Sequence, residues 1–143
     1  MPTGVYAYIT MDGTGKEAID FYKNALEAKV SGVQTFGELP ENPEFALPVE
    51  AKDRILHAQI QVGNTYFMLS DTFPGQPFDT GSQVNVCVTL EDAVKSKDVF
   101  DKLKTGGKVL MPLQETHWSL SYGQVQDKFG ITWQISTNLE ECM

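Results

Sequence analysis

The sequence has little of three things that would place it in a specialised class of protein. It contains two cysteines, Cys87 in an apolar strand pattern and Cys142 near the end of the chain, so we expect a reducing compartment and no disulfide framework. No apolar run approaches the roughly 20 residues that a membrane helix needs. The opening Met1-Pro2-Thr3-Gly4 lacks the basic and apolar stretches of a secretory signal. We therefore expect a cytoplasmic protein without a membrane partner.

Basic residues are also scarce. The chain has 11 Lys and Arg against 19 Asp and Glu, which gives a formal net charge of −8. A nucleic-acid surface needs clustered Lys and Arg, so we expect no nucleic-acid partner. The acidic balance is compatible with a cationic ligand, but acidic surfaces are also a common way of keeping a protein soluble.

What the chain does have is enough apolar sequence for a core and a pattern that occurs twice. Its length of 143 residues, 41% of them hydrophobic, suits a single domain. We expect a first module at about 1–71, a linker at about 72–81, a second module at about 82–137 and a tail at 138–143. Within each module the order is strand, helix and three strands.

The first module alternates between the periods of strands and helices. Two-residue alternation predicts strands at 5–11, 29–37, 54–62 and 65–70, the last two joined by the tight turn Gly63-Asn64. Thr14 and Glu17 form a predicted capping box at the start of a helix. An apolar stripe at helical spacing follows: Ala18, Ile19, Tyr22, Ala25 and Leu26. The proline-containing segment 38–53 is expected to be a loop or lid.

The second module repeats this order without repeating the residues. Strands are predicted at 82–90, 108–111, 121–126 and 131–136, and a helix at about 91–105 that ends at Gly106-Gly107. The apolar stripe of that helix is expected to contain Ala93, Val94, Phe100 and Leu103. The resulting fold class is α+β, with two βαβββ modules forming paired, partly open curved sheets around a cleft.

The strand faces opposite the helices are expected to line that cleft. They carry amides, hydroxyls, aromatics and one imidazole: Tyr6, Tyr8, Thr10, His57, Gln59, Gln61, Tyr66, Met68, Ser70, Asn85, Cys87, Thr89, Thr132, Gln134 and Ser136. Such a surface suits a small organic ligand, although a solvated sheet face would look the same. Trp118 and Tyr122 could stack on a flat ligand, whereas Trp133 shares the strand parity of Ile135 and is expected in the core. Cys87 could be a nucleophile, but a small buried hydrophobe is the expectation.

Several motifs in the correct order resemble PhnB-like proteins of the vicinal-oxygen-chelate (glyoxalase/bleomycin resistance/dioxygenase) superfamily. They cover nearly the whole chain: Tyr8–Gly13, Glu17–Tyr22, His57-Ala58 with Gly63, Met68–Asp71, Gln114–Thr116 ahead of Trp118, and Val125–Gln134. The last of these is similar to the closing Asp-x-Phe-Gly turn and final strand of the family. The resemblance implies paired βαβββ modules, a homodimer and, in many members, a divalent metal at the centre of the cleft.

The residues depart from the family at that metal. Gln134 stands at the position resembling the family's glutamate, Asn85 stands where a histidine is expected, and the other two strands offer Tyr6 or Tyr8 and Met68 or Ser70. Neutral amide oxygens hold zinc or nickel poorly, so the usual tetrad is absent and no cofactor is expected. His57, Glu115 and His117 form an alternative metal set without supporting spacing, and a protein without metal is the expectation.

Two functions are left open, and the sequence does not decide whether the protein is an enzyme. The first is a small-molecule-binding protein that sequesters its ligand, as bleomycin-resistance relatives do. Its contacts would come from Tyr6, Tyr8, Gln59, Met68, Ser70, Asn85, Cys87, Trp118 and Gln134. The second is a metal-dependent or His-based lyase or dioxygenase-like enzyme on a small oxygen-bearing substrate, with His57 and Glu115 as catalytic groups. Some family members carry a ubiquinone methyltransferase label, which the lack of a strand followed by a glycine-rich turn disfavours.

Overall fold

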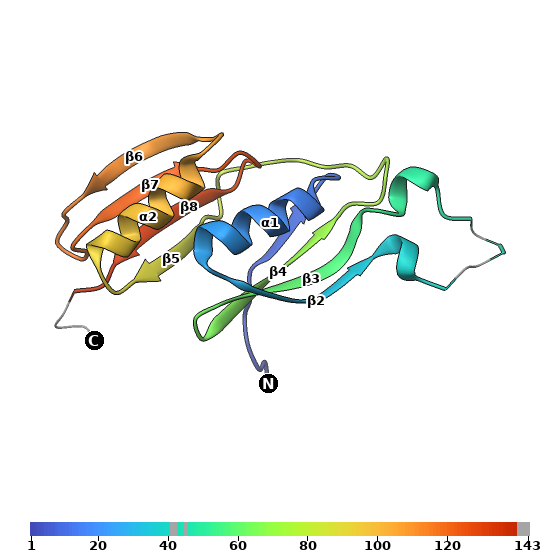
Figure 1. Cartoon of the computed structure of the whole chain (residues 1–143), viewed down its shortest axis with the longest axis horizontal. Helices are drawn as coiled ribbons and strands as arrows, with labels where there is room; N and C mark the ends of the chain where they lie inside the picture. The colour runs from blue at the N-terminus through green and yellow to red at the C-terminus, as the bar shows by residue number, and fades with distance from the viewer. Residues whose placement is uncertain (41–42, 45, 140–143) are drawn as a thin grey trace. The chain divides into compact units, whose positions relative to one another are not determined.

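In the computed structural model of the protein, which describes residues 1–40, 43–44 and 46–139, the chain divides between Phe78 and Asp79 into an N-terminal and a C-terminal unit (Figure 1). Cys142 lies outside the described residues. Each unit consists of one four-stranded sheet and one α-helix.

The N-terminal unit follows the order strand, helix and three strands. Its elements are β1 (Tyr8–Met11), α1 (Gly15–Leu26), β2 (Lys29–Thr35), β3 (Ile55–Val62) and β4 (Thr65–Asp71), with short 3-10 helices at Phe36–Glu38 and Val49–Ala51. The strand order is β1-β4-β3-β2. β1 runs parallel to β4, and the other neighbours are antiparallel. α1 packs on β2, β3 and β4.

The C-terminal unit repeats the same topology. Its elements are β5 (Val86–Leu90), α2 (Ala93–Lys104), β6 (Lys108–Gln114), β7 (Tyr122–Gln126) and β8 (Thr132–Thr137), in the sheet order β5-β8-β7-β6. β5 runs parallel to β8, as β1 does to β4. α2 packs on all four of its strands. The predicted α+β class with two βαβββ modules is therefore confirmed, whereas the single-domain assignment stays a prediction.

The alternation of apolar residues correctly predicts which faces are buried. In β4, Phe67 and Leu69 are buried while Met68 and Ser70 are half-exposed, and in β8 the core residue Trp133 is 1% exposed. All five residues of the predicted α1 stripe are buried. Each sheet thus has one apolar face under its helix and one mixed, partly solvated face, as expected for half-covered sheets.

The structure corrects several local predictions. The exposed residues Val5 and Val84 precede β1 and β5, which start later than predicted. Val94 is 82% exposed, because α2 turns a different stripe to the sheet: Ser96, Val99, Phe100 and Leu103. Cys87 is exposed rather than a buried hydrophobe, because it lies on the polar face of β5. β6 extends to Gln114, beyond the predicted end at Met111.

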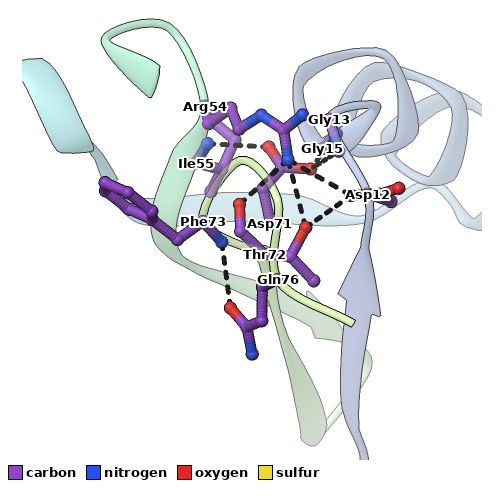
Figure 2. A network of polar contacts seen from close by, with 9 residues as sticks. All are labelled: Asp12, Gly13, Gly15, Arg54, Ile55, Asp71, Thr72, Phe73 and Gln76. Atoms are coloured by element: carbon purple, nitrogen blue, oxygen red, sulfur yellow. Dashed lines mark hydrogen bonds and ion pairs between the residues drawn. The ribbon is translucent and has the colours of Figure 1, made fainter. Parts of the chain in front are cut away.

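The predicted capping box of α1 is also wrong. Thr14 is the N-cap residue, but within the described chain its side chain makes no capping hydrogen bond. The buried Asp71 at the end of β4 replaces it: its Oδ1 accepts hydrogen bonds from the backbone N–H groups of Gly13 (2.8 Å) and Gly15 (2.9 Å). Its Oδ2 accepts from the N–H of Ile55 at 2.8 Å. One carboxylate therefore joins the start of α1, the start of β3 and the end of β4 (Figure 2).

Arg54 makes a second set of contacts, with Thr72 and Asp12. Its guanidinium donates to the carbonyl oxygen and hydroxyl of Thr72, both at 3.0 Å, and lies 3.3 Å from Asp12 Oδ1. The Thr72 hydroxyl donates to the same Asp12 oxygen at 2.6 Å. The hydrogen bond from Thr72, followed by that from Arg54, holds the pKa of Asp12 below its ordinary value. These contacts fasten the segment after β4 to the N-terminal unit (Figure 2).

The Asp-x-Phe-Gly turn has a structural explanation in the C-terminal unit. Asp127 Oδ1 accepts from the backbone N–H groups of Phe129 and Ile131, at 2.8 and 3.1 Å. Its Oδ2 accepts from the indole N–H of Trp133 at 2.8 Å. Asp127 is 3% exposed. This aspartate therefore closes the turn between β7 and β8 and orients the central core tryptophan, which are structural tasks.

Candidate ligand-binding sheet faces

The face of β5, β7 and β8 that points away from α2 carries a continuous series of polar side chains. Gln124 Nε2 donates to the Tyr122 hydroxyl at 3.0 Å, and this hydroxyl donates to Gln134 Oε1 at 2.8 Å. Gln134 Nε2 then donates to Asn85 Oδ1 at 3.2 Å. We call Gln124, Tyr122, Gln134 and Asn85 the amide–phenol row. It is half-buried, with Tyr122 8% exposed, and it contains no charged group.

Strand register explains why these four residues meet. Gln124 of β7 lies directly opposite Gln134 of β8, and Tyr122 lies opposite Ser136, one step along the same face. Side chains on one face of an antiparallel pair contact both directly and diagonally, which lets the Tyr122 hydroxyl reach Gln134. Asn85 precedes β5, the parallel neighbour of β8.

An exposed tryptophan borders the row. Trp118 is 58% exposed and meets the Tyr122 ring edge-on, with 5.4 Å between ring centroids and an interplanar angle of 72°. It lies in the connection between β6 and β7, next to the buried Ser119. Ser119 Oγ donates to the carbonyl oxygens of Ser121 and Thr137, which ties this connection to the end of β8. A large indole surface is thus held beside the polar row.

The corresponding face of the N-terminal unit carries His57 and three tyrosines. The Tyr8 hydroxyl and His57 Nδ1 lie 3.3 Å apart and share a hydrogen bond. Tyr6 stacks on Tyr66 with ring centroids 4.5 Å apart, and the hydrogen bond between the two, followed by burial, raises the pKa of Tyr66. The predicted ligand contacts Gln59, Met68 and Ser70 are half-buried on this face.

The two faces place different residues at equivalent positions. In the parallel pair of each sheet, Met68 lies beside Tyr8 and Gln134 lies beside Cys87. The resemblance draws its metal ligands from the positions of Tyr6 or Tyr8, Met68 or Ser70, Asn85 and Gln134, which hold phenols, a thioether or hydroxyl, and two amides. Amide and phenol oxygens are neutral and weak ligands for zinc or nickel, and Gln134 is already bonded to Tyr122 and Asn85. This donor set differs from the histidines and glutamates that the resemblance implies, and a protein without a metal stays a prediction.

The alternative metal set is divided between the units. His57 lies on β3 of the N-terminal unit, whereas Glu115 and His117 are exposed residues after β6 in the C-terminal unit. Among the described residues, no group of three or more His, Cys, Asp or Glu side chains is arranged to hold a metal ion. The catalytic roles of His57 and Glu115 stay predictions.

Cys87 lies on the same face as the row, opposite Gln134 in the sheet register. Burial of its thiol raises the pKa of Cys87, although the residue is exposed overall. A raised pKa leaves less thiolate at neutral pH, and thiolate is the nucleophilic form. The environment of Cys87 therefore disfavours a nucleophilic role.

Gln124 is the functional candidate that the sequence predictions missed. The sequence predicts Tyr122 only as a ring that could stack on a ligand. Both residues alternate with the buried Gly123 and Val125, so the two-residue period of β7 contains the signal that could have found them. The hydrogen bonds between the four side chains required the strand register.

Comparison with solved structures identifies the fold. The chain is similar to protein PA1353 from Pseudomonas aeruginosa, with a TM-score of 0.84 and 28% identity, covering 96% of this chain and 98% of that one. It is similar to a putative 3-demethylubiquinone-9 3-methyltransferase, PhnB protein, from Bacillus cereus, with a TM-score of 0.75, 23% identity and coverage of 94% and 99%. A glyoxylase/bleomycin resistance protein/dioxygenase domain from Frankia sp. EAN1pec has the same fold, with a TM-score of 0.67, 14% identity and coverage of 98% and 95%. The fold is that of the glyoxalase/bleomycin resistance superfamily.

Sequence comparison then identifies the family. Residues 4–136 match the family model described as 3-demethylubiquinone-9 3-methyltransferase, and the chain belongs to this family. Protein YjdN of Escherichia coli (strain K12) is 29% identical over 136 residues, which are 90% of this chain and 91% of that protein. The predicted PhnB-like membership is confirmed. The prediction against methyl transfer stays untested.

Among the described residues, neither α1 nor α2 is long and apolar enough to cross a membrane.

Proposed function

We propose that this protein binds a small, uncharged, planar polar molecule without a metal ion. The molecule would bind on the face of β5, β7 and β8 that points away from α2 in the C-terminal unit. The observation that carries the proposal is the amide–phenol row beside the exposed Trp118 ring. A row of neutral hydrogen-bonding groups next to an aromatic platform is the chemistry of a site that orients a small molecule.

The chemistry of the row favours a neutral ligand. Burying a charged ligand group against side chains that carry no opposite charge costs free energy, whereas a neutral polar group exchanges hydrogen bonds with water for hydrogen bonds with the protein. Each amide of the row has two lone pairs and two N–H donors, and the contacts within the row use only some of them. Further hydrogen-bonding capacity therefore remains for a ligand.

Trp118 supplies the contact area that the polar row lacks. An aromatic ring buries a large apolar surface and prefers stacked or edge-to-face partners. Its edge-to-face contact with Tyr122 leaves more than half of the Trp118 surface exposed. A planar ligand that stacks on this indole would lie within reach of the row.

Binding can be tested with three compounds of nearly the same shape: benzamide, benzoate and benzamidine. We expect benzamide to quench the emission of the exposed Trp118 saturably, with a Kd in the millimolar range typical of so small a ligand, and benzoate to bind least. The buried Trp133 provides an internal reference, because it is 1% exposed. An absence of saturable benzamide binding at millimolar concentrations would overturn the proposal.

Two variants distinguish the role of Trp118 as the fluorescent reporter from its role as a surface that contacts the ligand. Trp118→Phe removes the emission but keeps an aromatic platform, so ligand-observed NMR should still detect benzamide binding. Trp118→Ala removes the platform, and we expect binding to weaken at least severalfold. Equal binding by both variants would exclude Trp118 from the site.

A second candidate function rests on the contact between Tyr8 and His57 in the N-terminal unit. An imidazole can both accept and donate a proton, so His57 could serve as an acid–base group oriented by the tyrosine. This reading predicts an enzyme, and loss of turnover in both Tyr8→Phe and His57→Gln would support it. Homodimerisation remains a proposal that follows from the family resemblance, and sedimentation velocity tests it. A cytoplasmic location remains a proposal that follows from the scarcity of cysteine.

A further inference from the structure

The amide–phenol row continues beyond Asn85 to the backbone. Asn85 Nδ2 donates to the carbonyl oxygen of Ser82 at 3.0 Å. A carbonyl oxygen can only accept a hydrogen bond, so Asn85 must direct its NH2 group toward Ser82. This contact fixes which end of the Asn85 amide faces the rest of the row.

The orientation of Asn85 then determines the orientation of every later member. Its Oδ1 faces Gln134 and needs a donor, which Gln134 Nε2 supplies. Gln134 Oε1 consequently faces Tyr122 and accepts its hydroxyl hydrogen. With its hydrogen committed, the Tyr122 oxygen accepts from Gln124 Nε2. All hydrogen bonds in the row therefore point the same way, from Gln124 toward Ser82.

The opposite direction is unfavourable. Rotating Asn85 by half a turn would place its Oδ1 against the Ser82 carbonyl oxygen at the 3.0 Å separation of the present hydrogen bond. Two acceptors in that position repel each other and leave both without a donor. The Ser82 carbonyl oxygen therefore sets the direction of the hydrogen bonds made by Asn85 and by the side chains on β8 and β7; we call it the polarity anchor.

We infer that the far end of the row, Gln124 Oε1, is a fixed hydrogen-bond acceptor, and that the site selects planar ligands carrying an N–H or O–H donor. Within the described residues, the Gln124 amide makes one hydrogen bond, from Nε2, and its side chain is half-buried. The carbonyl oxygen is the end of the amide left for a ligand. This inference rests on the proposed function and names the ligand chemistry of the same site.

The first test compares benzimidazole with benzoxazole. They have the same shape, but benzimidazole has an N–H where benzoxazole has an oxygen. We expect benzimidazole to bind the wild-type protein about five- to tenfold more tightly by ligand-observed NMR, the effect of one additional hydrogen bond. In Gln124→Met, which keeps the length of the side chain but removes the amide, the preference should disappear.

The second test changes the anchor at the other end of the row. Asn85→Ala removes the contact that fixes the direction, so the three remaining members can reverse and the preference for benzimidazole should fall. Asn85→Asp is the matched control: its carboxylate cannot donate to the Ser82 carbonyl oxygen, but as an acceptor it still takes the hydrogen bond from Gln134 Nε2 and so maintains the direction. If the preference for benzimidazole over benzoxazole depended on Gln124 alone, both Asn85 variants would retain the wild-type preference.

The outcomes separate this inference from the proposed function. Equal affinity of the wild-type protein for both compounds overturns the fixed acceptor but leaves a binding site. An unchanged preference for benzimidazole in Asn85→Ala overturns the claim that the contact between Asn85 and Ser82 fixes the direction of the row. Failure of both compounds and of benzamide to bind overturns the proposed function itself. Circular dichroism of each variant checks that it is folded.

Discussion

The two units stabilise equivalent strand ends in different ways. Asp71 at the end of β4 pairs with Met11 of β1, and Thr137 at the end of β8 pairs with Leu90 of β5, so the two residues occupy the same position in the topology. Asp71 is a buried carboxylate that binds three backbone N–H groups. Thr137 is a buried hydroxyl that contacts Ser96 of α2 and donates to the Ser121 carbonyl oxygen.

The helix starts differ in the same way. α2 carries its own cap, because the Asp92 side chain accepts from the N–H of Lys95. α1 depends on Asp71, which is 56 residues away from Gly15 in the chain. A local cap can form with the helix, whereas the cap of α1 requires an assembled sheet. The comparison shows that, in the same fold, the backbone N–H groups at the start of a helix can be hydrogen-bonded by a neighbouring residue or by a side chain far away in the sequence.

Asp71→Ala is expected to have the largest effect on stability and tests the difference between the two helix starts. It leaves the N–H groups of Gly15 and Ile55 buried without an acceptor, and each such group costs about 1–3 kcal/mol. We expect the free energy of unfolding to fall by roughly 3–5 kcal/mol, measured by urea denaturation. A loss no larger than that of Asp92→Ala would contradict the long-range cap.

Gly15→Ala tests how closely that cap is packed. Alanine usually stabilises a helix relative to glycine, but a Cβ at Gly15 would lie 2.5 Å from Asp71 Oδ2 and 2.9 Å from Ile55 Cγ1. We expect a destabilisation of about 1–3 kcal/mol, the usual cost of overpacking, in the same denaturation assay. Gly81→Ala, where a Cβ meets open space, is the matched control and should change stability little.

Asp92→Ala measures the local cap of the other unit. Loss of its hydrogen bond to Lys95 should lower the free energy of unfolding by about 1 kcal/mol, the typical value for an N-cap. Asp92→Asn, which can still cap, should retain most of the stability. Equal losses in the two variants would show that the charge of Asp92, rather than its capping oxygen, is responsible.

Asp12→Asn is expected to have the smallest effect and a defined pH dependence. The contacts with Thr72 and Arg54 lower the pKa of Asp12 from 3.8, so the ionised carboxylate stabilises the folded state. That contribution is complete above pH 3.8 and is lost as the pH falls through the lower, folded-state pKa. The stability difference between wild type and variant should therefore be constant near neutral pH and vanish in acid, as pH-dependent denaturation would show.

Much of the fold could be predicted because it depends on residue periodicity. The alternation of Phe67 and Leu69 with Met68 and Ser70 follows from the pleat, in which successive side chains point to opposite faces. The exact boundaries depended on contacts elsewhere. Val94 is apolar and lies next to the start of α2, but it does not belong to the buried stripe of this helix. That stripe contains Ser96, Val99 and Phe100.

The sequence predicts most of the residues of the candidate site but not how their side chains are hydrogen-bonded. Asn85, Gln134 and Trp118 were expected at a ligand surface from strand parity and the family resemblance. Gln124 was missed. The direction of the row depends on the register of β7 against β8 and on the backbone carbonyl of Ser82. Neither is encoded in any short stretch of sequence.

The sequence by itself determined the two βαβββ units, the polar faces of their sheets and the neutral residues where the family's metal ligands would stand. These features follow from residue type and from the short periods of strands and helices. Only the tertiary structure decided that the side chain of Asp71, rather than that of Thr14, caps the start of α1 and that four side chains form one directed row. Both depend on hydrogen bonds between residues far apart in the chain, whose geometry exists only once the strands are paired.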